Sequence, residues 1–510
     1  MRSLFSLLAG LLRFLWALLT LLTPLLGVWL GSSLVSFYGL RAELALAAGV
    51  LLFPILPILW ELRATAAWNR ARTDERRMGK PPVRWLSGLE RLVLRTMIIN
   101  LAFLGGLLGY FPKVAFSALA TRGDWFLFEK HDAASDTLRS LLLTGAGGLE
   151  WLHRLANPNP YKKPGDDVPA PETVKPIDDQ KPTYPIRRWR KTTDPVPSAH
   201  PPDPQPSPEP PSTVGPAPTW QVGDTTWPQQ NDVSSVVLDM KPSDEISIEQ
   251  VARHIASKEH DPFARVKALH DWVVTRLDYD HDSLRRGQRK PQDAASVFAR
   301  RNAVCEGYAR LLVALGQSSG DHFVYVHGDT REEGGERAAI GHAWNAVEVL
   351  GKWYIVDATW DDPTIDGKSA HYRTDYLFIP PRLAIYDHRP ENDKWQMLSQ
   401  PLSRGEFLRQ PLTRPSLSRV GLELLVPDST RVEVNDGLQL QLANPRHLYL
   451  SARIGLSDAE HSERCGVSHS DPVTLFCPTP HQGKYRATVF ANHQESGTYD
   501  QVLALDVFRR

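Results

Sequence analysis

The sequence predicts an α+β protein made of several consecutive parts, and three features of its 510 residues support this fold class. Long uncharged runs near the N-terminus are typical of apolar helices. A proline-rich tract follows, and it has too little apolar surface to form a core. Beyond it, a region of mixed helical and strand periodicity gives way to short alternating segments, which are typical of a small all-β sandwich.

Changes in composition place the boundaries between these parts, since a chain of this length exceeds one ordinary domain. We expect a membrane region with about three transmembrane helices at residues 1–120 and a short helical segment at residues 121–156. A Pro-rich disordered linker at 157–230, a mixed α+β domain at 231–412 and a β-sandwich-like domain at 413–510 complete the organisation.

Three uncharged segments predict the membrane helices, namely residues 14–40, 44–60 and 96–112. The first is longer than the about 20 apolar residues that a crossing needs, whereas the other two are near the short limit of about 17. A buried or interfacial hairpin is the alternative for those two. A cleaved signal peptide fits the first segment poorly, because the apolar run of a signal peptide has only roughly 7–15 residues.

Basic residues predict the orientation. Only Arg41 lies between the first two segments, whereas the loop before the third carries Arg63, Arg70, Arg72, Arg76, Arg77, Lys80, Arg84 and Arg91. Such loops stay in the cytoplasm, so we expect a multi-pass protein of the cell membrane whose chain after about Lys113 is extracytoplasmic. The net charge is zero, from 58 basic and 58 acidic residues, and it offers no broad basic field for nucleic acid.

The linker contains the tract SAHPPDPQPSPEPPSTVGPAP, which favours extended polyproline conformations. At about 3.1 Å per residue, such a spacer holds the following domain far enough from a bilayer to reach a cell-wall layer. Docking to a proline-binding module is the alternative, and it requires such a module on the same side of the membrane.

The residues that carry chemistry are Cys305, His342 and Asp357, which supply a thiol nucleophile, a base and an orienting carboxylate. Cys305 is predicted to open an amphipathic helix, because apolar residues recur after it at helical spacing: Tyr308, Leu311, Leu312 and Leu315. The N-terminus of a helix favours negative charge and therefore stabilises a thiolate.

His342 and Asp357 lie in two segments rich in β-branched and aromatic residues, HAWNAVEV and WYIVDAT, which flank Gly351-Lys352. We expect an antiparallel hairpin with this pair as the turn, and both side chains then share one face of the sheet. In that register Asp357 lies opposite Ala346 rather than His342. Twist, a bulge or a change of register must close the gap.

Each of these three residues also has a structural alternative. Free cysteines are commonly buried hydrophobic residues, a single histidine is commonly a satisfied core residue, and an aspartate can simply end a strand. Their occurrence together favours the catalytic interpretation. A metal site is less favoured, because a closed zinc site uses about four ligands and no second cysteine lies nearby. No cofactor is expected.

The stretches AVCEGYARLLVALG, GHAWNAVEVLGKWYIVDATWDDP and TDYLFIPPRLAIYDHRPENDKWQML resemble the transglutaminase-like superfamily of cysteine enzymes, on its kyphoscoliosis peptidase-like branch. The resemblance implies a papain-like fold, in which a helix bearing the cysteine packs against an antiparallel sheet bearing the other two residues. It implies Cys305 as the nucleophile, His342 as the general base and acid, and Asp357 as the residue that holds the imidazole. Some relatives have lost these residues and are not catalytic, and some use calcium.

Other residues have less certain places in this arrangement. The backbone N–H of Cys305 is the expected first oxyanion donor. Gln292 and Trp272 are candidates for the second, although the helical spacing of Trp272 favours core packing. Trp344 and Trp360 either shield the site from water or are ordinary sheet aromatics.

Cys465 and Cys477 are close together in a strand-rich region, and we expect a disulfide between them in an oxidising compartment. Two reduced cysteines are the alternative. The segments around them, such as LYLSARIG and YRATVFAN, predict the β-sandwich-like domain, for which packing against the preceding domain is the default role.

Two functions are consistent with these features. The first is a membrane-anchored cysteine enzyme that acts on amide bonds of envelope or extracellular proteins and peptides through a Cys305 thioester. Transfer to water makes it a peptidase or amidase, and transfer to an amine makes it a cross-linking acyltransferase. The second is a non-catalytic envelope adaptor that uses the same fold to bind proteins. The complete set of three residues favours the enzyme.

Overall fold

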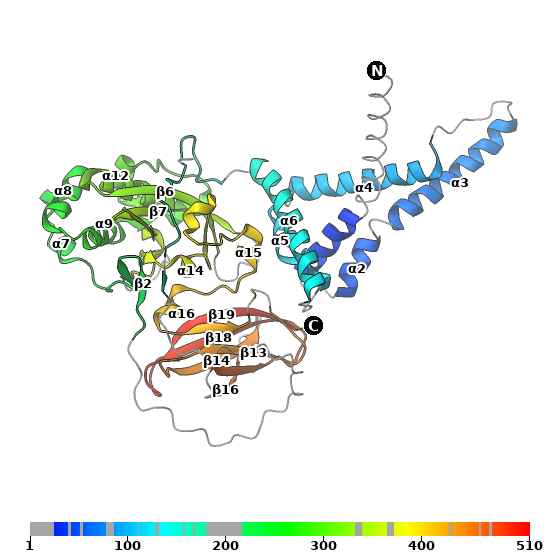
Figure 1. Cartoon of the computed structure of the whole chain (residues 1–510). Coiled ribbons are helices and arrows are strands. Elements are labelled where there is room, and N and C mark those ends of the chain that lie inside the picture. The colour runs from blue at the N-terminus through cyan, green and yellow to red at the C-terminus, as the bar shows by residue number, and fades with distance from the viewer. Residues whose placement is uncertain are drawn as a thin grey trace. The chain divides into compact units, whose positions relative to one another are not determined.

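The structure, a computed structural model shown in Figure 1, describes most of the chain. The described residues are 25–38, 42–51, 55–77, 86–110, 112–127, 132–156, 159–166, 169–177, 179–180, 217–331, 339–364, 372–427, 429, 432–457, 461–468 and 472–509.

A first compact unit contains the N-terminal helices. Besides the helical residues 25–37, these are α2 (Ala42–Val50), α3 (Leu56–Arg77), α4 (Gly88–Tyr110), α5 (Pro112–Arg122), η2 (Trp125–Leu127) and α6 (Ala133–Ala156). Leu30, Leu119 and Ala146 form a small buried apolar cluster within the unit. Ion pairs connect α3 with α4, since the Glu61 carboxylate binds Arg91 at 2.8 Å and also pairs with Arg95.

None of the helices in the described part of the chain is long and apolar enough to cross a membrane. The uncharged segment 44–60 is divided between α2 and α3, and in α4 only residues 96–110 lack charge, which is short of the about 20 residues that a crossing needs. The segment 14–40 lies outside the described residues except for 25–38.

These findings correct the predicted topology. The three-span arrangement is wrong, and so are the multi-pass membrane localisation and the extracytoplasmic placement that were inferred from it. Envelope substrates and cell-wall contact lose their basis at the same time, because both expectations depended on that placement.

The boundaries of the predicted linker at 157–230 also differ from the structure. Ala170 and Val174, before the proline-rich tract, and Trp220 and Trp227, after it, belong to the core of the following domain. The short strands β1 (Asp179–Gln180), β2 (Trp220–Val222) and β3 (Thr225–Trp227) form an antiparallel sheet. The apolar residues at the two ends supply buried surface that the proline-rich middle lacks. Residues 181–216 lie outside the described part of the chain.

The central domain, defined as the described residues from 159 to 412 outside α15, is built on a five-stranded antiparallel sheet of order β10-β6-β7-β8-β9. Its strands are β6 (His322–Thr330), β7 (Ile340–Val349), β8 (Lys352–Val356), β9 (Leu377–Ile379) and β10 (His388–Pro390). Their many β-branched and aromatic residues suit a pleated, buried surface. Strands β6 and β7 pair along their whole length, from His322 opposite Glu348 to Thr330 opposite Ile340.

Helix α12 (Cys305–Ser319) packs on β6 and β7, and α8 (Ile248–Lys258) and α9 (Pro262–Arg276) pack on α12. Figure 1 shows these three helices in green beside the two strands. Ser247 and Asp261 cap α8 and α9 by accepting backbone N–H groups of the first turn. The remaining elements of the domain are α7 (Ser235–Leu238), η3 (Pro242–Asp244), β4 (Asp278–Tyr279), α10 (His281–Arg286), α11 (Ala294–Arg300), β5 (Asn302–Ala303), α13 (Ala358–Asp361), α14 (Pro381–Ala384) and η4 (Asp393–Gln396). The excluded helix α15 is Arg404–Arg409.

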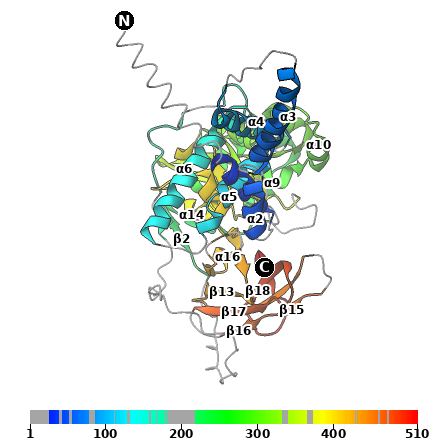
Figure 2. The ribbon, with the colours of Figure 1, turned by 90° about the vertical axis from the view of Figure 1, so that its right-hand side faces the viewer.

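The C-terminal domain, from residue 413 onward, consists of α16 (Pro415–Arg419) and two sheets. One sheet contains β11 (Glu423–Val426), β13 (Gly437–Ala443), β17 (Val473–Pro478) and β16 (Gly466–Val467), and Figure 2 shows the last three side by side. The other contains β12 (Val432–Val434), β19 (Asp500–Arg509), β18 (Gly483–Asn492), β14 (Tyr449–Leu456) and β15 (Glu463–Arg464). Side chains from both sheets share one apolar core, so the domain is a β-sandwich.

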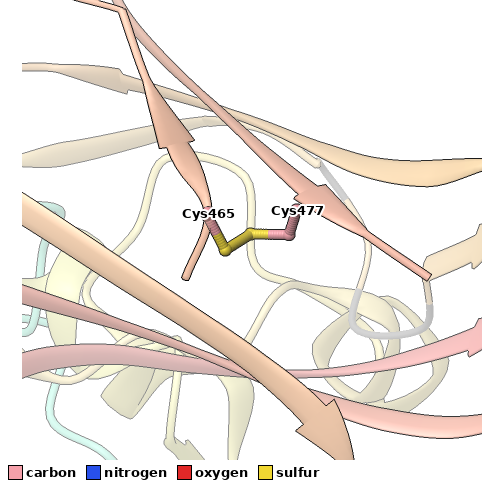
Figure 3. Close-up of a disulfide and its surroundings, with 2 residues drawn as sticks. All are labelled: Cys465 and Cys477. Carbon is pink, nitrogen blue, oxygen red and sulfur yellow. A yellow bond between two sulfur atoms is a disulfide. The ribbon is translucent and has the colours of Figure 1, made fainter. Parts of the chain in front are cut away.

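A disulfide joins Cys465 to Cys477 in this core, as Figure 3 shows. Cys465 lies between β15 of one sheet and β16 of the other, and Cys477 lies on β17. Because Gly466 is opposite Phe476, continuing the register by one residue brings the two cysteines opposite each other, with their Cα atoms 4.3 Å apart. The predicted bridge is confirmed.

Candidate active site

Cys305 is the first residue of α12, so the predicted helix start is confirmed. Apolar residues on its buried face, among them Leu311, Leu312 and Leu315, fix the helix against the core. The side chain of Gln292 binds the preceding turn, where its Oε1 accepts the Val304 N–H at 3.1 Å. The Cys305 side chain is thereby held at the positive end of a 15-residue helix, a place that stabilises a thiolate.

His342 lies on β7, and Asp357 follows the last residue of β8. The turn between the strands is Leu350-Gly351 rather than Gly351-Lys352, because Val349 pairs with Lys352. Both turn residues have positive φ, 51° and 76°, as the tight hairpin turn requires. In this register Asp357 lies opposite Trp344. Trp344 is two residues from His342 in β7, and both point to the same face of the sheet.

The change of register therefore closes most of the gap between the two side chains. His342 Nε2 lies 2.7 Å from Asp357 Oδ2. Cys305 and His342 line the same cavity, and the charge of Cys305 acts on the imidazole. The structure thus brings together all three residues that the sequence singled out.

The charges of the group reinforce one another. Burial lowers the pKa of His342, but the negative charges of Asp357 and Cys305 outweigh that effect and raise it to about 10. For Asp357, burial raises the pKa, and the charge and hydrogen bond of His342 outweigh it and bring the pKa well below the usual range. At neutral pH the arrangement favours an imidazolium beside a carboxylate.

Four hydrogen bonds fix the Asp357 carboxylate. Oδ1 accepts the backbone N–H groups of Thr359 at 2.8 Å and Trp360 at 3.4 Å, which makes Asp357 the N-cap of α13. Oδ2 accepts from His342 and from a second histidine, His388, whose Nε2 is 2.9 Å away. Sequence reasoning missed His388, although it lies in the quoted stretch YDHRPEND, where an Asp-His pair was the available signal.

The tryptophans have different places. Trp344 is buried in the core with its ring stacked near His342, at a centroid distance of 5.8 Å. Trp360 lines the cavity at the site, and its ring is 5.6 Å from His342. Trp272 is fully buried and stacks on Phe298, so core packing is confirmed for it.

A segment assigned to the linker covers Cys305. Burial raises the pKa of the Tyr161 hydroxyl, as do the charge of Cys305 and a hydrogen bond to its sulfur. Tyr161 is only 4% exposed and Cys305 only 1%. The Tyr161 carbonyl accepts from the Tyr325 hydroxyl at 2.8 Å, and Arg289 stacks on the Tyr161 ring. An isolated aromatic residue among charges and prolines, in PNPYKKPGDD, was the only sequence signal.

Charged neighbours fasten the same segment to the central domain. Lys162 pairs with Glu391 at 3.0 Å, and Asp166 pairs with Arg310 at 2.7 Å. Asn159 Nδ2 donates to the Gly328 carbonyl at 2.8 Å. We call residues 159–166 the covering segment.

A cavity of about 830 Å³ opens beside Cys305 and His342. Its wall is aromatic, with a few charged groups, and it includes Tyr161, Tyr279, Trp360, Arg373, Asp375 and Tyr376. A space of this size and lining suits part of a peptide chain rather than a small ion.

One group of described residues has a spacing that a metal ion could use, namely His342, Asp357 and His388, with candidate ligand atoms within 4.8 Å of one another. These atoms are already joined by hydrogen bonds between nitrogen and oxygen. The arrangement therefore fits a proton-sharing network directly, and a metal would have to displace those bonds.

Comparison with known proteins agrees with this architecture. The family profile described as the transglutaminase-like superfamily matches residues 249–358. Kyphoscoliosis peptidase of Mus musculus is 25% identical over 199 residues, which cover 37% of this chain and 30% of that protein. The human protein of the same name is 24% identical over 37% of this chain and 30% of that protein. Hillarin of Drosophila melanogaster is 23% identical over 38% of this chain and 26% of its own length.

The matched region spans less than a third of the length of these relatives. It coincides with the part of the central domain in which a helix beginning at a cysteine packs on an antiparallel sheet. The chain therefore carries a domain of the transglutaminase-like superfamily, on the branch of kyphoscoliosis peptidase.

Proposed function

We propose that the central domain is a cysteine enzyme that transfers acyl groups from amide bonds of protein or peptide substrates. Cys305 is the nucleophile, His342 the general acid and base, and Asp357 the residue that holds the imidazole. The observation that carries the proposal is the His342–Asp357 hydrogen bond of 2.7 Å beside Cys305, which lies at the N-terminus of a helix and lines the same cavity as His342.

The proposed reaction has two halves. The Cys305 thiolate attacks the carbonyl carbon of the amide, and the His342 imidazolium then protonates the leaving amine, so the C–N bond breaks and a thioester forms. In the second half His342 removes a proton from water or from an amine. That acceptor attacks the thioester, and the thiolate leaves. Water yields a carboxylic acid, and an amine yields a new amide.

The backbone N–H of Cys305 is the proposed first donor to the oxyanion. As the first residue of α12 its N–H has no partner within the helix, so it is available to an oxyanion formed at the Cys305 sulfur. Gln292 is held by two backbone bonds, since its Oε1 accepts from Val304 and its Nε2 donates to the Lys290 carbonyl at 3.0 Å. Its role is therefore better described as fixing the start of α12.

A non-catalytic binding role is the second candidate, and one observation favours it. Cys305 is only 1% exposed and is buried in a cluster that includes Tyr161, so we expect that Tyr161 must move before a substrate carbonyl reaches the sulfur. If the segment never moves, the domain binds proteins without cleaving them.

Reaction with a thiol probe separates the two functions. Cys305 is the one cysteine outside the disulfide, so a small electrophile reports on a single site. The enzyme proposal predicts rapid labelling at neutral pH, slow labelling of His342→Ala, and no labelling of Cys305→Ala. Equal labelling of the wild-type and His342→Ala proteins would favour the binding role.

A further inference from the structure

The side chains of His388 and Asp387 lie beside the proposed catalytic residues and have no part in the reaction described above. His388 Nε2 is 2.9 Å from Asp357 Oδ2, and its Nδ1 is 2.7 Å from Asp387 Oδ1. His342 approaches the same Asp357 oxygen at 2.7 Å. A continuous hydrogen-bonded chain of four buried side chains therefore runs from His342 through Asp357 and His388 to Asp387.

This geometry determines the charge of His388. An imidazole that donates from both nitrogens carries two ring protons and is therefore an imidazolium, and both of its partners are carboxylates. Burial lowers the pKa of His388, but the charge of Asp387 and the two hydrogen bonds outweigh burial and raise it.

Asp387 also accepts hydrogen bonds from residues other than His388. Its Oδ2 accepts from the Tyr376 hydroxyl at 2.6 Å and from Arg414 at 3.3 Å. The ring of His388 also contacts Trp344, Trp360 and Tyr376. The titratable and charged groups that face His388 are therefore Asp357, Asp387, His342 and Tyr376, with Arg414 acting through Asp387.

We propose that His388 is a positioning residue, which fixes the Asp357 carboxylate and acts as a second cation on the oxygen that Asp357 presents to His342. The contribution of His388 to the reaction rests on the proposed function, whereas its effect on the pKa of His342 does not. With His388 in place the Asp357 charge is shared between two imidazoliums, whose ring centroids are 5.4 Å apart. Without it, that charge would stabilise the His342 imidazolium alone.

The sharing has a chemical benefit. A general acid works best when its pKa is near the working pH, and the pKa of His342 is already raised to about 10 by its acidic neighbours. A second cation opposes a further rise, so His342 gives up its proton to the leaving amine more readily.

The decisive measurement is the titration of His342 by NMR in the full chain labelled with ¹³C-histidine. A Cys305→Ser background is used, because loss of the thiolate charge lowers the pKa of His342 toward an accessible range. His388→Gln retains an N–H donor but not the charge. It should raise the pKa of His342 by about one unit or more, whereas Asp357→Asn should lower it.

A matched control is His322→Gln, which removes another histidine of the same sheet, bonded to Glu348 at 2.9 Å and away from the site. It should leave the titration of His342 unchanged. The proposal is overturned if His388→Gln leaves the pKa of His342 unchanged or lowers it. The proposal is also overturned if the purified protein holds a stoichiometric metal whose removal by a chelator changes the titration of His342. In that case His342, Asp357 and His388 would be metal ligands.

Turnover tests the positioning role separately. His388→Ala should lower kcat about 10–100-fold, as loss of a supporting hydrogen bond commonly does, with KM little changed and partial recovery in His388→Gln. If the wild-type protein turns over no amide, the proposed function fails while the titration still decides the inference. If the wild-type protein is active and His388→Ala retains full kcat, only the inference fails.

Discussion

The central domain and the C-terminal sandwich bury different kinds of side chain. The central domain encloses ionisable groups, including His270, Asp271 and Asp361 as well as the candidate site. The core of the sandwich is aliphatic, with Leu438, Leu440 and Leu475 among its members, and it contains a disulfide. Among the described residues of the sandwich, Arg446 is the one charged side chain that is buried.

The difference has a physical basis. Removing a charge from water costs several kcal/mol, so buried charges persist only where partners compensate them. In the central domain they are paired, and His270 for example bonds Asp271 at 3.2 Å and Asp361 at 3.1 Å. The sandwich instead relies on apolar area and on a constraint within the chain. We therefore expect chemistry and pH sensitivity in the central domain and a pH-independent stability in the sandwich.

The largest expected effect is on turnover. Cys305→Ala should abolish amide hydrolysis or amine incorporation, a loss of about 10⁴-fold or more, because a methyl group cannot act as a nucleophile. Its thermal unfolding should stay close to that of the wild-type protein, since the side chain is small and packed. Residual activity near the wild-type level in a Cys305→Ala preparation would assign the chemistry to another residue.

Asp357→Asn should retain the fold and lose about 10³–10⁴-fold in kcat, because a neutral amide neither orients the imidazole in the same way nor stabilises its charged form.

The pKa of His342 is raised to about 10, so the imidazolium needed for leaving-group protonation is present below that pH and lost above it. Wild-type kcat/KM should fall only near pH 10, and the alkaline limb of Asp357→Asn should move to lower pH. An unmoved limb would exclude His342 as the titrating acid.

The buried network around His270 should make the central domain sensitive to alkali. Burial lowers the pKa of His270, but bonds to Asp271 and Asp361 outweigh burial and raise it to about 9. A raised pKa contributes stability that is complete below the unfolded value of about 6.5 and is lost as pH rises through 9. Across this window the unfolding free energy of the wild-type protein should fall by about 3 kcal/mol more than that of His270→Gln.

Removing the disulfide should affect only the sandwich. The double variant Cys465→Ala, Cys477→Ala should lose roughly 3 kcal/mol of unfolding free energy, because the bridge closes a short loop and so restricts the unfolded chain. The same loss is expected at pH 6.5 and pH 9, unlike the effect at His270. A loss that changes strongly with pH would contradict the contrast between the two domains.

The smallest effect is expected at the covering segment. Tyr161→Phe removes the hydroxyl that bonds the Cys305 sulfur, and it should increase the rate of Cys305 alkylation a few fold, on the order of one hydrogen bond. Tyr325→Phe, which removes the bond to the Tyr161 carbonyl, is the companion variant and should act in the same direction. Slower alkylation in both variants would show that Tyr161 activates the thiol rather than covering it.

Residue spacing within short segments predicted the helix at Cys305 and the shared face of His342 and Asp357. The apolar residues after Cys305 predicted its helix, and the two-residue alternation of strands placed His342 and Asp357 on one face. The register was predicted wrongly because Leu350 adopts φ 51°, a conformation that turn rules assign to glycine or asparagine.

Such patterns do not predict contacts between residues that are far apart in the sequence. Tyr161 lies far from Cys305 in the chain and was assigned to the linker, and His388 reaches Asp357 only after β10 has paired with β6. The membrane prediction failed for a related reason. Lack of charge in a segment does not show where a helix begins and ends, and none of the helices in the described residues is long and apolar enough to cross a membrane.

The proposed reaction requires Cys305 to form a thioester, and trapping that intermediate tests the mechanism directly. The full chain is mixed with a peptide amide, quenched in acid within milliseconds to seconds, and examined by intact-mass and peptide mass spectrometry. We predict an acyl adduct on Cys305 that accumulates before product in the wild-type protein and is absent from Cys305→Ala. Product formation without any adduct on Cys305, or with an adduct on another residue, would contradict the account.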